Sequence, residues 1–87
     1  MNKFNDKYFL TSNFYCSVFC YLKGLQLIDI DRSNPQRAQF VFVDTPEREN
    51  LIRQFNFAER NSIEVMVDAR EFEMTIKTLK DKLYQGS

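Results

Sequence analysis

The sequence predicts an α+β fold in which a small antiparallel sheet packs against three helices, in the order β-α-β-β-α-(β)-α. The first observation behind this prediction is that residues 8–22 carry no charge and place apolar side chains around nearly the whole circumference of a helix. The second is that residues 38–44 are apolar on both faces of a strand, as in the centre of a sheet. Both segments need cover on several sides, and a chain of 87 residues can supply it only as one domain, which we expect to span residues 1–85.

The N-terminal part of this domain is expected to contain a short strand and the apolar helix. Residues 1–6 are polar and expected to be frayed, and residues 8–10 are expected to form the strand. The helix is predicted over residues 12–23, with a hydroxyl of Thr11 or Ser12 accepting a hydrogen bond from its first turn.

Two cysteines, Cys16 and Cys20, lie one helical turn apart in this segment. A tetrahedral structural metal site needs four ligands, and the chain has no histidine and no other cysteine. Free cysteine usually packs as a small apolar side chain. We therefore expect both thiols to be buried, unbridged and metal-free.

The middle of the chain predicts a β-hairpin, with residues 25–32 pairing antiparallel to residues 38–44. The first strand changes phase near Ile28, and residues 33–36 (Ser-Asn-Pro-Gln) are typical of a turn. Side chains alternate between the two faces of a strand, so Phe40 and Phe42 point to one side and Val41 and Val43 to the other.

Two more helices are predicted in the C-terminal half. Thr45 supplies a capping hydroxyl for a helix over residues 46–57, and an Asp68 cap begins a helix over residues 69–84. Between them, residues 63–67 alternate in polarity and predict a short edge strand. Gly86 and Ser87 are expected to be a cloning scar.

Composition restricts the function. Twelve basic and twelve acidic residues cancel, so the net charge gives no sign of nucleic acid or membrane binding. The absence of histidine removes the commonest general base and metal ligand, and no glycine-rich phosphate loop is present. We expect no enzymatic activity, no cofactor and no membrane span, and the missing secretory leader with only two cysteines favours a cytoplasmic location.

Several short motifs resemble a small uncharacterised family of domains of unknown function from bacteria, phages and mobile elements. They are Tyr8-x-x-Thr11-Ser12, Leu22-Lys23-Gly24, Phe40-Val41-Phe42 and Val67-Asp68-x-Arg70-x-Phe72. The resemblance covers roughly residues 7–84 and implies the fold and a phage or mobile-element origin, with no catalytic residue. The loop Glu59-Arg60-Asn61-Ser62 departs from the family pattern.

The predicted function is a non-enzymatic protein-binding or adaptor module. Cover for the apolar helix uses one sheet face, so we expect the other face to be an apolar interface exposing either the phenylalanine or the valine pair. Its partner is a second copy, as a homodimer, or a larger complex. The candidate binding residues are Arg32, Arg37, Phe40, Phe42 and Asp44.

The alternative function is a nucleic-acid-binding accessory protein. Residues 37–42 (Arg-Ala-Gln-Phe-Val-Phe) are similar to the aromatic strand motif of RNA-recognition domains, although Gln39 replaces the first aromatic residue. In this interpretation the sheet face stacks on bases while Arg32 and Arg37 contact the phosphate backbone. Steep salt dependence of binding would distinguish it from apolar protein binding.

Overall fold

The computed structural model describes residues 7–85, and the predictions for residues 1–6 and 86–87 lie outside this range. The elements follow in the order β1 (Tyr8–Thr11), α1 (Phe14–Leu22), β2 (Leu27–Asp31), β3 (Gln39–Val43), α2 (Arg48–Phe57), the 3₁₀-helix η1 (Ile63–Val65) and α3 (Ala69–Gln85). The predicted α+β class with a small antiparallel sheet and three helices is confirmed.

The sheet has the strand order β1-β3-β2, with both outer strands antiparallel to β3. Residues 39–43 therefore form the central strand, and the predicted pairing of the hairpin is confirmed. The register of β2 shifts between Leu27 and Asp29, which places a bulge at the expected change of phase near Ile28. Phe9, Phe42 and Leu27 consequently share one face of the sheet, since Phe42 is opposite both of the others.

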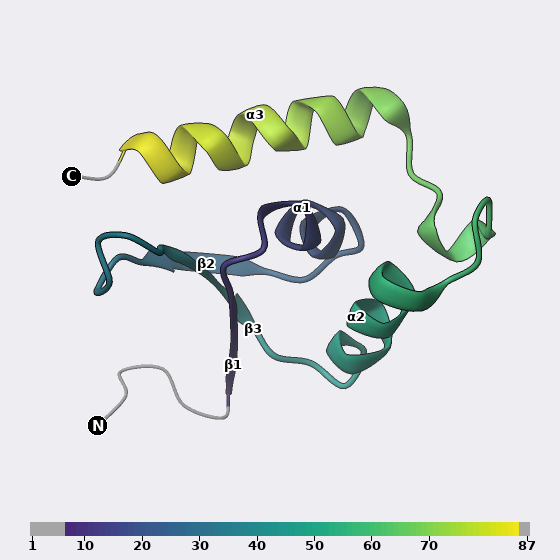
Figure 1. Cartoon of the computed structure of the whole chain (residues 1–87), viewed down its shortest axis with the longest axis horizontal. Helices are drawn as coiled ribbons and strands as arrows, with labels where there is room; N and C mark the ends of the chain where they lie inside the picture. Colours follow the sequence, from purple (N-terminus) through teal and green to yellow (C-terminus); the bar gives the residue numbers. More distant parts are fainter. Residues whose placement is uncertain (1–6, 86–87) are drawn as a thin grey trace.

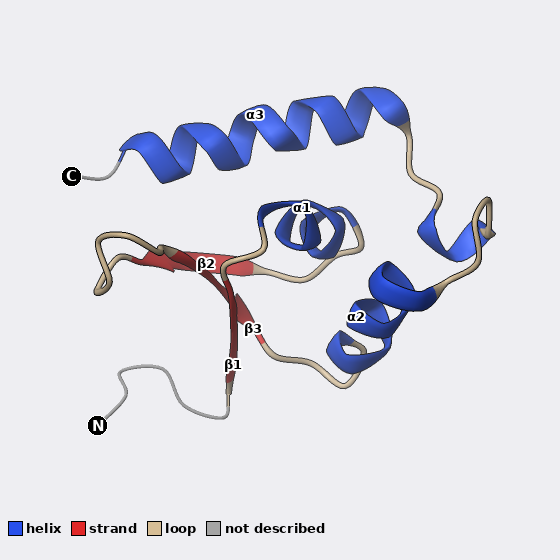
Figure 2. Cartoon of the chain, in the orientation of Figure 1, coloured by secondary structure: helices blue, strands red, loops and turns tan. Residues whose placement is uncertain are grey.

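Helix α1 lies between the sheet and α3, with α2 at its side (Figure 1). Val18 and Cys20 are completely buried, and the Phe14 ring lies 6.0 Å from the ring of Phe40 in the sheet below. On the α2 side, the ring centroids of Phe19 and Phe55 are 5.5 Å apart. The sheet (red) on one side of α1, with α3 and α2 (blue) on others, thus supplies the cover that the apolar helix requires (Figure 2).

The N-cap of α1 is Asn13, so the prediction that Thr11 or Ser12 caps this helix is wrong. The Asn13 Oδ1 atom accepts a hydrogen bond of 3.0 Å from the Cys16 N–H. Thr11 instead pairs with Phe40 in the sheet, and its hydroxyl accepts a bond from the Asn13 N–H. The extension of β1 to Thr11 delays the start of the helix by two residues.

Two predictions for the C-terminal half are also wrong. The Thr45 hydroxyl does not cap α2: it is buried and has no hydrogen-bond partner within residues 7–85, and α2 begins only at Arg48, after a turn. Residues 63–65 form η1 in place of the predicted edge strand, because the Ser62 hydroxyl accepts a bond from the Glu64 N–H and starts a helical turn. The start of α3 agrees with the prediction, since Asp68 Oδ1 accepts bonds from the first-turn N–H groups of Arg70 and Glu71.

Candidate functional site

The predicted aromatic residues of the sheet are in the core and are not accessible. Phe40 and Phe42 are almost completely buried on the face covered by α1, and Val41, on the opposite face, is 0% exposed. Val43 is half-buried. The prediction that one of the two pairs forms an exposed apolar face is therefore wrong for Phe40, Phe42 and Val41. Base stacking on the phenylalanines would require the core to open.

The two predicted arginines are at the surface, and each joins the hairpin to another segment: Arg32 to α3, and Arg37 to the connection between β1 and α1. The Arg32 guanidinium donates hydrogen bonds of 2.8 and 3.0 Å to the carbonyl oxygens of Lys82 and Leu83 in the last turn of α3. The Arg37 Nε atom donates a 3.0 Å bond to the Ser12 hydroxyl. Arg32 thus caps α3, where a cation is favourable at the negative end of the helix dipole.

Asp44 belongs to a third contact, which joins the end of β3 to the start of α2. Its carboxylate accepts bonds of 3.0 and 3.3 Å from the Arg48 guanidinium, which lies 4.8 Å from the centroid of the Phe9 ring. Hydrogen bonding to Asp44 raises the pKa of Arg48. Arg32, Arg37 and Asp44 are therefore not gathered in one site, and each has a partner within the fold.

The cysteines are buried and free, as the sequence predicts. A hydrogen bond with the Cys16 sulfur, together with burial, raises the pKa of the Cys20 thiol, and the same bond lowers the pKa of Cys16. Within residues 7–85, no cluster of three or more His, Cys, Asp or Glu side chains could hold a metal ion.

Sequence reasoning missed a group of exposed apolar side chains in the stretch of chain from the end of α2 through η1 to the start of α3. We define the corner patch as Phe57, Ile63, Met66 and Val67, of which Phe57 is 80% and Ile63 82% exposed. This region lies at the opposite end of the molecule from the β2–β3 turn (Figure 1). The sequence signal for these side chains is the run of apolar residues within 63–67. Its alternation predicts a strand with one buried face, and this expectation hides the exposure.

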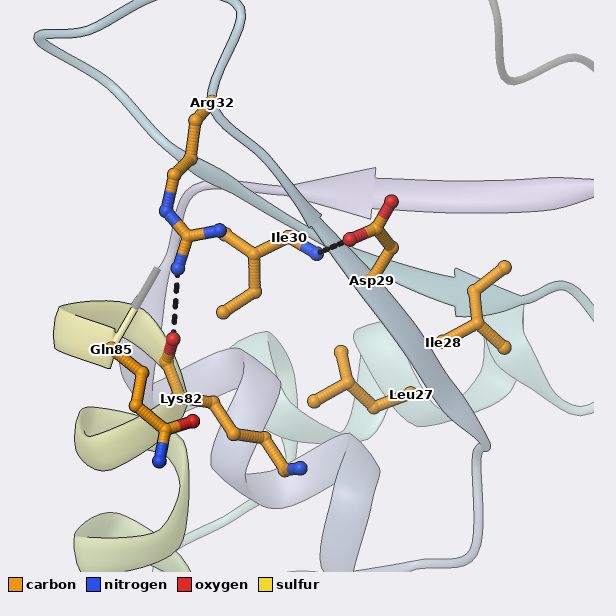
Figure 3. Close-up of a pocket in the computed structure, with 7 residues that line it drawn as sticks. All are labelled: Leu27, Ile28, Asp29, Ile30, Arg32, Lys82 and Gln85. Carbon is orange, nitrogen blue, oxygen red and sulfur yellow. Dashed lines mark hydrogen bonds between the residues drawn. The ribbon is translucent and has the colours of Figure 1, made fainter. Parts of the chain in front are cut away.

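A second surface follows the side of α3 that faces the C-terminal end of α1 and strand β2. At the α1 end, a hollow of about 320 Å³ contains Tyr21, Leu22, Glu71, Met74 and Thr78. At the β2 end, a pocket of about 430 Å³ is lined by residues of β2, Arg32, Lys82 and Gln85 (Figure 3). We call the two together the α3 groove, because Glu71, Met74, Thr78, Lys82 and Gln85 recur at helical spacing along one side of α3.

The exposed edge of β2 beside this groove is poorly suited to pairing with another strand. Asp29 Oδ1 accepts a 2.8 Å bond from the Ile30 N–H, which occupies a donor that an added strand would use (Figure 3). The bulge at Ile28 interrupts the edge further. The groove thus favours a partner that packs side chains against α3.

Comparison with known proteins assigns the fold to a family. The model of a domain of unknown function, DUF5659, matches residues 6–85. The chain belongs to this family. No curated protein and no solved structure matches the chain. Within residues 7–85, the helices of this DUF5659 domain lack the length and apolar composition needed to cross a membrane.

Proposed function

We propose that this domain is a non-enzymatic protein-binding module whose partner covers the corner patch. The observation that carries the proposal is the exposure of Phe57 and Ile63, which is 80% or more for both side chains. Met66 and Val67, in the segment between η1 and α3, are also exposed. An exposed apolar patch on a small domain usually marks an interaction site.

The surroundings of the patch support a protein partner over nucleic acid. The hollow that contains Phe57 is also lined by Arg53 and Glu64, and the one that contains Met66 and Val67 by Lys23, Asp68 and Glu71. Charges of both signs around an apolar centre resemble the rim of a protein interface. A phosphate backbone would instead require a basic surface. A phage or mobile-element origin remains part of the proposal and rests on the family resemblance alone.

Site-specific photo-crosslinking in the native host tests the proposal. A benzoylphenylalanine in place of Ile63 should yield a protein adduct of higher mass, whereas the same residue in place of Glu49, an exposed position on α2, should not. The adduct should survive nuclease and be removed by protease. Equal adducts from both positions would contradict the proposal, and a nuclease-sensitive adduct would favour the nucleic-acid alternative.

A further inference from the structure

The two ends of the α3 groove carry net charges of opposite sign. At the α1 end, the acidic Glu71 and Asp68 outnumber the basic Lys23. At the β2 end, the basic Lys82 and Arg32 outnumber the acidic Asp29. Within residues 7–85, neither the Glu71 carboxylate nor the Lys82 ammonium has an ion-pair partner. Eleven residues separate them, which is about 16 Å along a helix.

The centre of the groove is uncharged and contains exposed apolar surface. Met74 is 65% exposed and Thr78 is half-buried one turn further along the same side of α3. At the two ends, Tyr21 is partly exposed beside Glu71, and Leu27 is half-buried in the pocket with Lys82. An end with net negative charge, an apolar centre and an end with net positive charge therefore follow one another along α3.

When a second copy of α3 is placed antiparallel to the first, the negative end of each groove lies opposite the positive end of the other. A two-fold axis that crosses α3 near Ile76 and Lys77 sets each Glu71 opposite the partner's Lys82 and brings the Met74 and Thr78 side chains of both copies together. The end that contains Tyr21 then lies against the partner's end that contains Leu27. Two-fold contacts of this isologous kind are the commonest form of self-association.

We propose that the α3 groove is the interface of a homodimer in which two α3 helices pack antiparallel. The occupant is a second copy because the charges at the two ends match under this rotation and leave no like charges opposed at Glu71 and Lys82. Glu71 also lines the hollow that contains Met66 and Val67, but the other groove residues of α3 lie outside the corner patch. The dimer and the proposed protein partner can therefore be tested separately at Lys82 and Ile63.

Charge reversal tests this geometry by sedimentation equilibrium from low to high micromolar concentration. Glu71→Lys and Lys82→Glu should each weaken the dimer about ten-fold, because each converts two attractive contacts per dimer into repulsive ones. The double variant Glu71→Lys/Lys82→Glu restores opposite charges at both contacts and should return to within about three-fold of the wild type. A merely structural role of either residue would not produce this rescue.

Two further variants complete the experiment. Glu73→Lys, an exposed reversal on the other flank of α3, should leave the dissociation constant unchanged, and Met74→Asp should abolish the dimer while circular dichroism shows a folded domain. A wild-type monomer at high micromolar concentration, or a double variant weaker than both single ones, would overturn the proposal. Either result would leave the crosslinking experiment at Ile63 unaffected.

Discussion

Two regions of the described chain differ in burial: one supplies the fully buried core, and the other packs against that core from outside. Every buried residue within residues 7–85 lies in residues 16–42 or in α3, at Thr75 and Leu79. Residues 43–74, which include α2 and η1, contribute half-buried and exposed side chains only. The same second region contains the corner patch. The difference indicates that residues 16–42 and α3 supply the fully buried core, whereas α2 and η1 combine half-buried contacts to that core with apolar surface that stays exposed.

The largest expected effect separates two phenylalanines, one from each region. Phe42→Ala removes a fully buried ring beneath α1 and should lower the free energy of unfolding by about 3–5 kcal/mol. Phe57→Ala removes an exposed ring and should change it by less than about 0.5 kcal/mol. Denaturant unfolding of both variants measures the difference, and equal losses would remove the distinction between the regions.

A medium effect concerns the thiols of α1 at alkaline pH. The raised pKa of Cys20 keeps this thiol protonated in the folded state, while the unfolded chain ionises it above its ordinary pKa near 9. Its contribution to stability is therefore complete below about pH 9 and decreases above it by about 1.4 kcal/mol per pH unit. The pKa of Cys16 is lowered in the folded state, so this thiol ionises there at a lower pH than in the unfolded chain. Its effect on the pH dependence of stability therefore lies below about pH 9.

The matched control is the double variant Cys16→Ala/Cys20→Ala, in which neither group titrates. The stability of the wild type should fall relative to this variant as the pH rises above 9, as measured by urea unfolding at several pH values. A constant difference between the two proteins would contradict the burial of Cys20. Native thiol labelling should also be slow, because both side chains are buried.

A smaller effect is expected from the arginine that joins the hairpin to α3. Arg32→Ala removes both bonds to the carbonyls of Lys82 and Leu83 and should cost about 1 kcal/mol, since water replaces the lost donor at this exposed position. Arg37→Ala loses a single bond to Ser12 and should cost less than about 0.5 kcal/mol. Thermal unfolding ranks the two variants, and the reverse order would show that Arg32 does not secure α3.

The sequence was most informative where one periodic pattern extends over a whole element. The hairpin strands and α3 were predicted within two residues because alternation and the Phe72-Ile76-Leu79-Leu83 stripe each indicate one conformation. The sequence did not identify the N-cap of α1, because Thr11, Ser12 and Asn13 are all residues that cap helices well. Only the pairing of Thr11 with Phe40 in the sheet selects Asn13.

The candidate site was harder to predict, because exposure depends on which side of an element the fold covers. An apolar β3 predicts a central strand but not the burial of Val41 on the second face. The alternation of residues 63–67 fits a strand, yet the Ser62 cap and the left-handed backbone of Asn61, with φ of 67°, direct this segment into a turn and η1. Arg32 and Arg37 lie at the surface, but their contacts with α3 and Ser12 join residues that are far apart in the sequence and left no pattern in it.

The separation of stability from binding is tested most directly by the double variant Phe57→Ser/Ile63→Ser. Both side chains are at least 80% exposed, so the free energy of unfolding of this variant in urea should lie within about 0.5 kcal/mol of the wild type. A crosslinker at the neighbouring Met66 forms a partner adduct in the wild type and should lose this adduct in the double variant. A loss of about 2 kcal/mol or more would show that the corner patch belongs to the folded core. An undiminished adduct from Met66 would show that the patch does not bind the partner.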